Sequence, residues 1–268
     1  MINIRRLSIR RTLFCLFLAW LFIFPVHAQE TLERKIAQMV MVGFSPYSQF
    51  RDTLHYDIEH RNLGGAPLFA SDLENPSADH GDERGTAGHG GYEAAYRHGP
   101  GRGFCREAGR EQRFFRTPTA YHLGTVVDSE DSTRRYAGMM ADWLSSTGIN
   151  TNLAPVADVN VNPSSPAIGY FERSFSSDPD KVTDHVSWFA SESAERGVMT
   201  ALKHFPGHGS AEQDSHLGFT DITETWSEAE LVPYRELISD GYSGMVMAGH
   251  LYNAGIDSVY PASLSEKR

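Results

Sequence analysis

The sequence predicts an α/β protein built as a (β/α)8 barrel of the TIM type. Short apolar segments of strand length alternate with helical segments at steps of roughly 45 residues, which is the rhythm of βα units in a parallel sheet. Polar residues follow the predicted strands at Asp158, at Lys203-His204 and at His250. Barrel enzymes keep their functional residues at the carboxyl ends of their strands, so this regular placement favours a barrel over a doubly wound sheet.

The first 28 residues have the three-part pattern of a secretory signal peptide. Four arginines precede an apolar run from Leu13 to Phe24, and Ala28 supplies a small residue at a suitable cleavage point. The run is short for a membrane span, so we expect cleavage and a secreted or periplasmic protein rather than an anchored one. The sequence thus divides into a signal peptide, residues 1–28, and one domain, residues 29–268.

Composition and charge exclude several classes of protein. The chain is 40% hydrophobic and 22% charged, an ordinary globular balance. Removal of the four arginines of the signal would take the formal net charge from −10 to −14, which disfavours nucleic acid or an anionic membrane surface as a partner. Of the two cysteines, Cys15 lies in the signal and Cys105 alone remains, so no internal disulfide is expected. We expect a monomer without a cofactor.

The first elements of the mature chain are short. Residues 32–38 predict a helix, and the apolar residues 39–43 predict a buried strand after it. Residues 64–69 predict the next strand. From residue 76 to residue 112, Gly, His, Arg and Glu crowd together and neither helical nor strand periodicity survives. So long a stretch without structure is unusual inside a compact domain.

Regular patterning resumes in the next part of the chain. The apolar spacing of residues 132–146 predicts a helix, with Asp131 or Ser132 as its cap and Gly148 as its stop. Residues 152–156 then predict a strand.

The same alternation continues towards the carboxyl end. Residues 178–197 predict a helix that begins with a capping aspartate and a proline and ends at a glycine. Residues 198–202 predict a buried strand. Residues 227–230, Ser-Glu-Ala-Glu, have the pattern of a capping box and predict a third helix to about Asp240, and residues 244–248 predict another buried strand.

The most informative stretch of the chain follows the strand 198–202. It reads Lys-His-Phe-Pro-Gly-His-Gly at 203–209 and continues after a short gap with Asp-Ser-His at 214–216. Its proline and glycines disfavour helix or strand interior, so a functional loop is predicted. For any single histidine, a structural bond to a backbone carbonyl is the alternative. A metal site on His204 and His208 is disfavoured because the residues between them break the helical geometry that would align the rings, and we expect no metal.

These residues resemble the signature of glycoside hydrolase family 3, in its β-N-acetylhexosaminidase branch. Residues 154–160, Ala-Pro-Val-Ala-Asp-Val-Asn, and residues 168–175, Ile-Gly-Tyr-Phe-Glu-Arg-Ser-Phe, are similar to two further motifs of the family. The resemblance covers most of the mature chain and likewise implies the barrel. It also implies a retaining enzyme that removes terminal N-acetylglucosamine from β-linked oligosaccharides, with peptidoglycan and chitin fragments both compatible as sources.

The resemblance assigns roles to six residues. Lys203, His204 and Arg173 would bind the hydroxyls of the sugar, and Asp158 would help to shape the site. A structural ion pair behind the loops is the alternative for Asp158 and Arg173. Retaining hydrolysis needs a carboxylate nucleophile and a separate proton donor, and the resemblance implies that His216 is the donor and Asp214 its partner. Histidine titrates near neutrality and a neighbouring carboxylate orients its ring, although the same residues also fit a local turn.

Two of the family's motifs have no counterpart in the sequence. The family's nucleophile is an aspartate downstream of a segment like Pro-Ala-Ser-Leu-Ser at 261–265, and the chain stops at Arg268. We therefore expect a barrel that is incomplete at its carboxyl end, without a nucleophile, that folds poorly and lacks normal turnover.

The family's Asp-Gln-Glu-Gly-Gly motif is also missing. His-Gly-Pro-Gly-Arg-Gly at 98–103 stands in its place, and suitable codons for this hexapeptide spell Thr-Asp-Gln-Glu-Gly when read one nucleotide later. This predicts that the window 76–112 is a frameshifted translation, with the frame restored before Phe114. A solvated insertion is the alternative.

Three functions remain open at this point. The first is a β-N-acetylhexosaminidase represented by a truncated form. The second is a family 3 β-glucosidase, against which the histidine-containing motif argues. The third is a noncatalytic carbohydrate-binding remnant.

Overall fold

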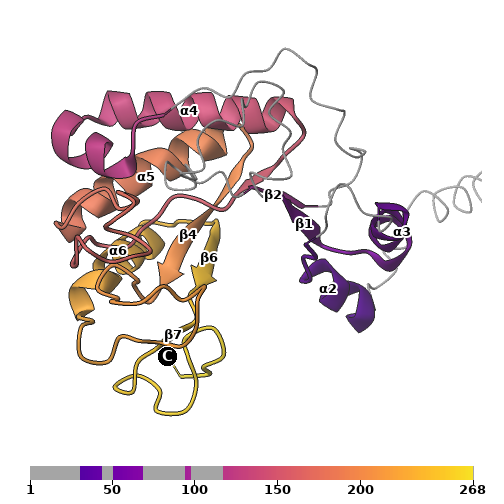
Figure 1. The fold of residues 1–268 in the computed structure, drawn as a ribbon. Coiled ribbons are helices and arrows are strands. Elements are labelled where there is room, and N and C mark those ends of the chain that lie inside the picture. Colours follow the sequence, from indigo (N-terminus) through magenta and orange to yellow (C-terminus); the bar gives the residue numbers. More distant parts are fainter. Residues whose placement is uncertain (1–30, 44–50, 69–93, 98–116, 268) are drawn as a thin grey trace, which may run out of the picture.

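The computed structural model describes residues 31–43, 51–68, 94–97 and 117–267. The predicted signal peptide lies outside these residues, and so does the window 76–112 except for one short strand. Figure 1 shows a small group of elements at one side of the molecule and a larger body beside it. The small group holds α2 (Leu32–Gln38), α3 (Arg51–Arg61) and β1 (Gly65–Leu68). The larger body holds α4 (Glu130–Ser146), α5 (Pro179–Glu195), β4 (Met199–Phe205), α6 (Val232–Ser239) and β6 (Met245–Ala248).

The strands form one five-stranded sheet and one small sheet. The order in the larger sheet is β1-β2-β3-β4-β6, with β2 at Ala94–Arg97 and β3 at Thr151–Asn152. The pairs β3–β4 and β4–β6 are parallel, as βα units predict, whereas β2 runs antiparallel to both of its neighbours. The small sheet pairs β5 (Thr220–Asp221) with β7 (Leu251–Tyr252) in parallel. Among the described strands the sheet does not close into a barrel.

Local signals predict α5 and its surroundings correctly. The Asp178 side chain caps the helix by accepting a hydrogen bond from the Asp180 N–H at 3.0 Å, and Pro179 is its first residue. Gly197 ends the segment with φ = +74°, a conformation that glycine adopts without strain. The strand that follows is confirmed as β4, and the predicted strands at 64–69 and 244–248 are confirmed as β1 and β6. The prediction that 244–248 is buried is wrong, because the residues of β6 are half-buried or exposed.

The helix α4 begins earlier than the sequence predicts. Ser129 is its cap and accepts a hydrogen bond from the Ser132 N–H, so the assignment of Asp131 or Ser132 as cap is wrong. Asp131 instead lies in the first turn, where its negative charge is favourable beside the free N–H groups. Gly148 follows the helix with φ = +85°, as predicted for a stop.

The capping box at 227–230 is also wrong. Ser227 makes no side-chain capping bond, and Glu228–Leu231 forms a short 3₁₀ helix, η3, ahead of α6. The Glu230 side chain is fully buried and bonds to another loop instead of reaching back to its own helix. The sequence pattern was a correct sign of a helix start but gave the wrong role to its last residue.

The prediction of a buried strand at residues 39–43 is wrong. Met41 makes an isolated parallel bridge to Gly65, and the side chains of Met39, Val40 and Val42 are exposed. Apolar composition shows that a segment favours burial, but burial requires a neighbour that packs over it. The helix α3 has no counterpart in the sequence prediction, and its Leu54 and Ile58, four residues apart, pack into a small buried cluster.

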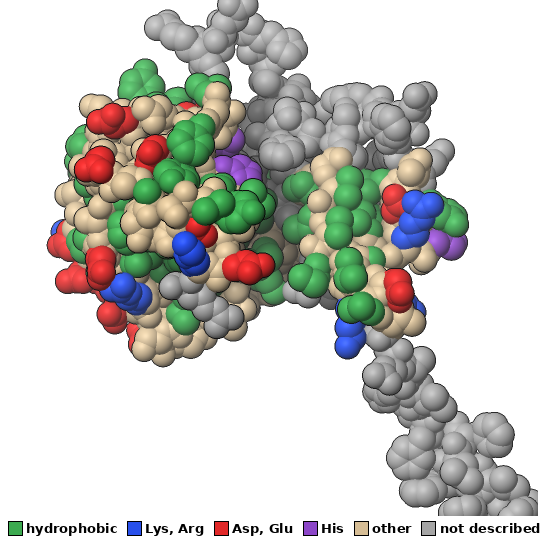
Figure 2. Space-filling model, turned by 90° about the horizontal axis from the view of Figure 1, so that it is seen from below, with side chains coloured by type: hydrophobic (Ala, Val, Ile, Leu, Met, Phe, Trp, Pro, Cys, Tyr) green, Lys and Arg blue, Asp and Glu red, His purple; other side chains and the backbone are tan. Residues whose placement is uncertain are grey.

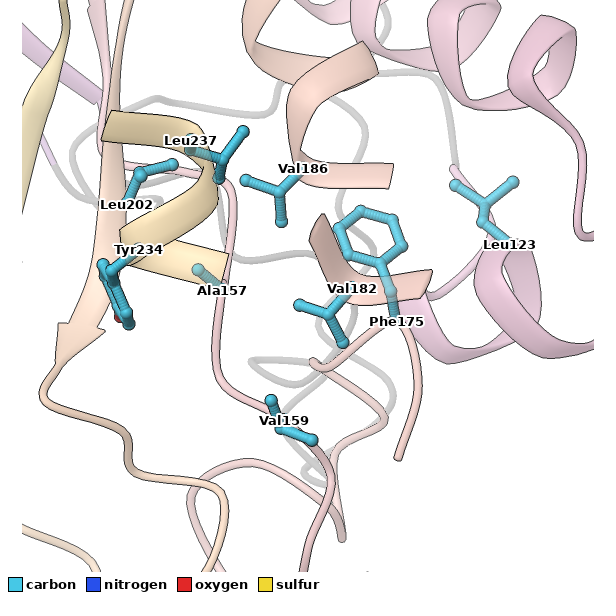
Figure 3. Close-up of a cluster of buried hydrophobic side chains, with 9 residues drawn as sticks. All are labelled: Leu123, Ala157, Val159, Phe175, Val182, Val186, Leu202, Tyr234 and Leu237. Atoms are coloured by element: carbon cyan, nitrogen blue, oxygen red, sulfur yellow. The ribbon is translucent and has the colours of Figure 1, made fainter. Parts of the chain in front are cut away.

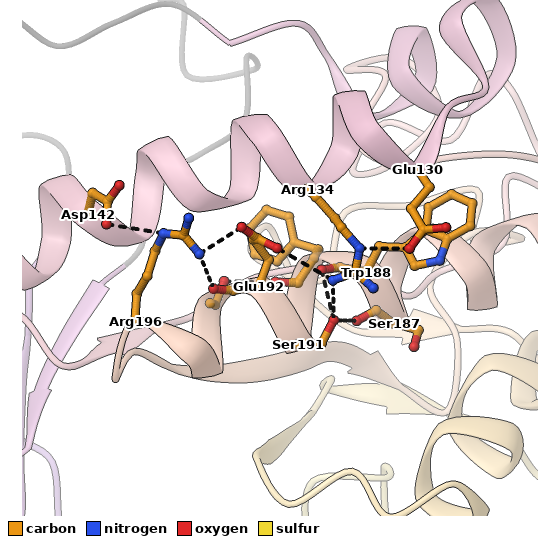
Figure 4. Close-up of polar contacts among 10 residues, drawn as sticks. Glu130, Arg134, Asp142, Ser187, Trp188, Ser191, Glu192 and Arg196 are labelled. Atoms are coloured by element: carbon orange, nitrogen blue, oxygen red, sulfur yellow. Dashed lines mark hydrogen bonds and ion pairs between the residues drawn. The ribbon is translucent and has the colours of Figure 1, made fainter.

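Helices α4 and α5 pack side by side in the larger body (Figure 1). Their facing sides bury an apolar cluster that includes Ala137, Leu144 and Phe189. Above it, Glu192 of α5 bonds Arg134 at 3.4 Å and Arg196 at 2.7 Å, and the network extends to Glu130, Asp142 and Ser191 (Figure 4).

A second apolar cluster packs around β4 and the segment that contains Asp158. It contains Leu123, Ala157, Val159, Phe175, Val182, Val186, Leu202, Tyr234 and Leu237 (Figure 3). Asp158 lies between two members of this cluster in the chain, and Lys203 follows a third. The polar residues of the candidate site are therefore anchored directly by the core.

Figure 2 shows the molecule from below, and histidine side chains are visible at one edge of the larger body. The surface of the small group seen in this view is largely apolar. Of the helices in the described part of the chain, none has the length and apolar character needed to cross a bilayer.

Candidate functional site

The central strand β4 carries the first two residues of the candidate site. The sequence predicts a loop from Lys203 onward, but β4 continues to Phe205, so Lys203 and His204 lie on the strand itself. The register between β4 and β6 shifts between Lys203 and Phe205, which marks an irregularity at this point. The Ala157 N–H donates to the Lys203 carbonyl at 2.7 Å and brings the following residue, Asp158, beside the strand end.

The Asp158 carboxylate organises the segment that leaves β4. Its side chain is fully buried. One oxygen accepts hydrogen bonds from the backbone N–H groups of His204 and His208, at 3.0 and 2.8 Å, and the other lies 2.8 Å from His204 Nδ1. Burial alone would raise the pKa of Asp158, but the charge and hydrogen bonds of His204 outweigh it, so the pKa lies below its usual value.

His204 is the partner of this carboxylate and is almost fully buried. Burial lowers its pKa against the opposing influence of Asp158. The contact of Nδ1 with the carboxylate fixes the ring and leaves Nε2 as the second nitrogen. Asp158 pairs with His204 at 2.8 Å, whereas Arg173, the other residue of the ion pair that the sequence left open, donates to the Ala167 carbonyl. The buried oxygens of Asp158 hold the loop and do not face a ligand.

Two glycines of the motif are required by close contacts. A Cβ at Gly209 would lie 1.7 Å from the carbonyl oxygen of Val159. Gly207 has φ = +129°, and a Cβ there would lie 2.5 Å from the Cβ of Glu230. The absence of a side chain at Gly209 lets the loop approach Val159, and its absence at Gly207 lets Glu230 pack directly on the loop backbone.

Glu230 is a buried carboxyl beneath the same loop. Its Oε2 accepts hydrogen bonds from the N–H groups of Gly209 at 2.9 Å and Ser210 at 3.3 Å. Its side chain has no exposed area, and burial raises the pKa of the carboxyl to about 7. Three consecutive N–H groups, those of His208, Gly209 and Ser210, are therefore held by two carboxyl groups from different parts of the chain.

His208 connects the part of this loop next to β4 to the part that holds Asp214 and His216. Its side chain is buried, and its Nε2 lies 3.0 Å from the hydroxyl oxygen of Ser215. Ser215 stands between Asp214 and His216 in the chain. The position of His208 therefore bears directly on the position of both.

Asp214 and His216 form a pair at the surface. The His216 N–H donates to Asp214 Oδ1 at 2.9 Å, and His216 Nδ1 lies 2.7 Å from the same oxygen. These bonds to His216 lower the pKa of Asp214, although partial burial opposes the shift. The His216 side chain is 68% exposed, so its Nε2 edge is open to a ligand while Nδ1 is held by the carboxylate.

Arg173 and Lys203 meet in a separate pocket of about 80 Å³. Apolar side chains, including Phe175 and Val156, supply most of the remaining wall. Arg173 also donates to the Ala167 carbonyl at 2.8 Å, which fixes its guanidinium. The pocket places two cationic groups beside an apolar surface, an arrangement suited to a polyhydroxylated ligand with an apolar face.

Metal binding has no support in the described part of the chain, where no group of three His, Cys, Asp or Glu side chains is placed to hold an ion. The rings of His204 and His208 lie 5.7 Å apart at 74°, and His204 Nδ1 is taken by Asp158.

The structure therefore arranges the six predicted site residues in three groups. These are Arg173 with Lys203, Asp158 with His204, and Asp214 with His216. Sequence reasoning did not assign roles to Ser215 or Glu230, and it treated His208 only as a member of the cluster. Ser215 and His208 lie inside the recognised motifs and could have been found there, whereas Glu230 was hidden by its agreement with a capping pattern.

Residues 31–268 match the family described as the glycosyl hydrolase family 3 N terminal domain. Beta-hexosaminidase LpqI of Mycobacterium tuberculosis is 43% identical over 121 residues, 44% of this chain and 30% of that protein. The Beta-hexosaminidase of Nitrosomonas eutropha is 30% identical over 233 residues, 81% of this chain and 62% of that protein. This chain thus spans less than two thirds of the length of either relative.

Two solved structures resemble the fold. The crystal structure of a glycosyl hydrolase of the GH3 family from Mycobacterium smegmatis has a TM-score of 0.51 and 35% identity, covering 56% of this chain and 45% of that chain. A glycoside hydrolase family 3 beta-N-acetylglucosaminidase from Paenibacillus has a TM-score of 0.68 at 24% identity, covering 88% and 45%. Together with the family match, these likenesses indicate a TIM-barrel-type α/β fold, of which the described strands form an open part.

Proposed function

This chain belongs to glycosyl hydrolase family 3, and on that basis we propose that the protein carrying it is a β-N-acetylhexosaminidase. The observation that supports the proposal most is the Asp214–His216 pair, joined at 2.7 Å with the histidine ring exposed. The relatives that share the family are named beta-hexosaminidases. The substrate is an oligosaccharide with a terminal β-linked N-acetylglucosamine.

His216 serves as the proton donor to the leaving oxygen. Asp214 holds Nδ1, so Nε2 is the nitrogen that delivers the proton and later removes one from water. The carboxylate orients the ring and stabilises the positive charge that it carries before transfer. A retaining mechanism also needs a carboxylate nucleophile, and no residue of this chain is assigned that role.

The sugar is bound at the end of β4. Arg173 and Lys203 supply charged donors to its hydroxyl groups from the shared pocket. His204 presents the second nitrogen of a ring that Asp158 holds in place. Asp158 acts through His204 and the loop, because its own oxygens are buried and bonded within the protein.

The cellular context follows from the sequence. Residues 1–28 act as an export signal, residues 29–268 form part of the catalytic domain, and the mature protein works as a secreted or periplasmic monomer. Peptidoglycan and chitin fragments are the candidate sources of substrate.

The window 76–112 is a frameshifted segment. Sequencing of the corresponding DNA tests this directly: the absence of any inserted or deleted base on either side of these codons would refute it.

The experiment that tests the function is a paired assay, on aryl β-N-acetylglucosaminide and aryl β-glucoside, of the complete protein that carries this sequence. We expect that protein to turn over the first substrate, and we expect no normal turnover by the 268-residue chain alone, because no residue of it is assigned as the nucleophile. His216→Ala should lower kcat by about 10²- to 10⁴-fold, the usual contribution of a general acid. The loss should shrink with a leaving group that needs no protonation, because His216 then has less to contribute.

His122→Ala is the matched control, since His122 is an exposed histidine far along the chain from the motif. Preference for the glucoside would replace the proposal by a β-glucosidase, and sugar binding without turnover of either substrate would support a noncatalytic role. Equal losses in the His122 and His216 variants would remove the role assigned to His216.

A further inference from the structure

Glu230 stands out among the residues that the proposed reaction does not use. It is the third residue of the short helix η3, whose Glu228 is exposed and pairs with Arg235 at the surface. The Glu230 side chain points the other way and has no exposed area. Burying a carboxyl group is costly unless hydrogen bonds compensate, so its position calls for a specific partner.

That partner is the backbone of the loop that leaves β4. Glu230 Oε2 accepts from Gly209 at 2.9 Å and from Ser210 at 3.3 Å. The side chain also packs against Gly207 so closely that a Cβ there would lie 2.5 Å from the Glu230 Cβ. Glu230 thus holds the segment 207–210 both by hydrogen bonds and by contact.

This segment joins the two halves of the proposed site. On one side it follows Lys203 and His204 along β4. On the other side the buried ring of His208 bonds Ser215 at 3.0 Å, and Ser215 lies between Asp214 and His216. Asp158 anchors the first half through His204 and His208. Glu230 holds the N–H groups of the segment after His208, and the Asn162 N–H donates to the Gly209 carbonyl at 3.0 Å.

We infer that Glu230 is a positioning residue that fixes the loop 207–210 and thereby sets the position of the Asp214–His216 pair relative to the sugar-binding end of β4. This inference rests on the proposed function for the meaning of that pair. Glu230 touches neither the sugar nor the reacting atoms in this role. Its loss should therefore affect the rate of the chemical step more than the binding of the sugar, since small misplacements of a catalytic group reduce rates strongly.

Two substitutions separate positioning from packing. Glu230→Met keeps an unbranched side chain of similar length but offers the loop no oxygen. Glu230→Gln keeps a carbonyl oxygen that can accept from the same two N–H groups, without the added strength that charge gives such bonds. Glu228→Gln on the same short helix is the matched control, because Glu228 is exposed and lies away from the loop.

The measurements are kcat and KM on an aryl β-N-acetylglucosaminide and hydrogen exchange of the backbone amides from 207 to 216, all on the complete protein that carries this sequence. We expect Glu230→Met to lower kcat by about 10- to 100-fold with KM changed by less than about threefold. Exchange should accelerate at residues 209 and 210 and also at 214 to 216. Glu230→Gln should recover most of both effects, and Glu228→Gln should match the wild type.

Unchanged kcat and exchange in a folded Glu230→Met variant would overturn the inference. So would faster exchange at 209 and 210 that leaves 214 to 216 and kcat untouched, since Glu230 would then support its own loop only. If Glu230→Met does not fold, Glu230→Gln decides alone: the small acceleration of exchange that remains at 209 and 210 should extend to 214 to 216, and acceleration confined to 209 and 210, or none at all, overturns the idea. If the wild type cleaves no aryl glycoside, the proposed function fails, while the exchange pattern still tests the link between the two parts of the loop.

Discussion

His208 Nε2 lies 3.0 Å from the hydroxyl of Ser215, and this bond joins the part of the loop next to β4 to the part that holds Asp214 and His216. Both parts belong to the one loop between β4 and β5, and the two bonded residues are seven apart in the chain. His208 is buried and Ser215 is half-buried, so the bond is partly shielded from water. It is a contact through which a change at the strand end can reach the proposed acid.

Ser215→Ala should lower activity more than its small size suggests. The Nδ1 of His208 already lacks a partner among the described residues, and the substitution would deprive Nε2 of its partner as well. A buried polar group without a partner costs about 1–3 kcal/mol, so we expect the free energy of unfolding to fall by about that amount. We also expect kcat to fall by about tenfold, because His216 is the next residue.

Urea denaturation and steady-state kinetics measure the two effects of Ser215→Ala. Ser239→Ala, at an exposed serine at the end of α6, is the control and should change neither. A Ser215→Ala variant with wild-type stability and kcat would mean that water replaces the hydroxyl without loss.

Asp158→Asn should destabilise the protein strongly. The carboxylate accepts from three donors, and an amide in its place would turn an NH₂ group towards one of them. Loss of one partner from a buried charged pair costs about 3–5 kcal/mol. Urea midpoints compared with those of Asp240→Asn, at an exposed aspartate, check this expectation. A loss below about 1 kcal/mol would show that the loop is held by other contacts.

Much of the fold could be predicted because its signals are local. The helix α5 is delimited by the cap and proline at 178–179 and by the glycine at 197. Each of these signals acts within one turn of the helix end that it marks, and the structure confirms them. The motif at 203–209 likewise identified the site from residues that are close in the chain. The paired bonds of Asp214 and His216 agree with the interpretation of that segment, and their catalytic role stays a prediction.

The errors arose where the answer depends on residues far away in the chain. Residues 39–43 look like a buried strand, but the described elements leave their side chains exposed. Ser227 and Glu230 look like a capping box, but the carboxyl accepts hydrogen bonds from Gly209 and Ser210, which are 21 and 20 residues earlier in the chain. The extension of β4 through His204 was missed because Asp158, from another strand end, supplies the bonds that hold it.

Glu230 should make the protein less stable as the pH rises towards neutrality. Burial raises the pKa of its carboxyl to about 7 from 4.5. Between these values the folded state holds a proton that the unfolded state has released. The free energy of unfolding therefore falls with pH, by up to about 1.4 kcal/mol per unit, and this fall ends above about pH 7.

Glu230→Gln carries no such proton and should lack this slope. The stability of the variant relative to the wild type should grow by about 3 kcal/mol between about pH 4.5 and about pH 7.5. Urea midpoints at both pH values measure the difference, and other titrating groups cancel in the comparison. Glu228→Gln should show no such trend, because Glu228 is exposed. A constant difference for Glu230→Gln would show that Glu230 titrates near its ordinary value.

Gly138 of α4 should respond to substitution according to the state of Arg196. A Cβ at this glycine would lie 2.9 Å from the guanidinium carbon of Arg196, which pairs with Glu192 and Asp142 between α4 and α5 (Figure 4). Gly138→Ala gains about 1 kcal/mol of helix propensity but displaces the guanidinium, so we expect almost no net change in stability. In an Arg196→Ala background the closest obstacle is gone and the Glu192 side chain, at 3.1 Å, has lost the partner that holds it there, so the same substitution should stabilise the protein by about 1 kcal/mol. Urea denaturation of the four proteins gives the coupling energy, and equal effects in both backgrounds would mean that Arg196 moves aside without losing its ion pairs.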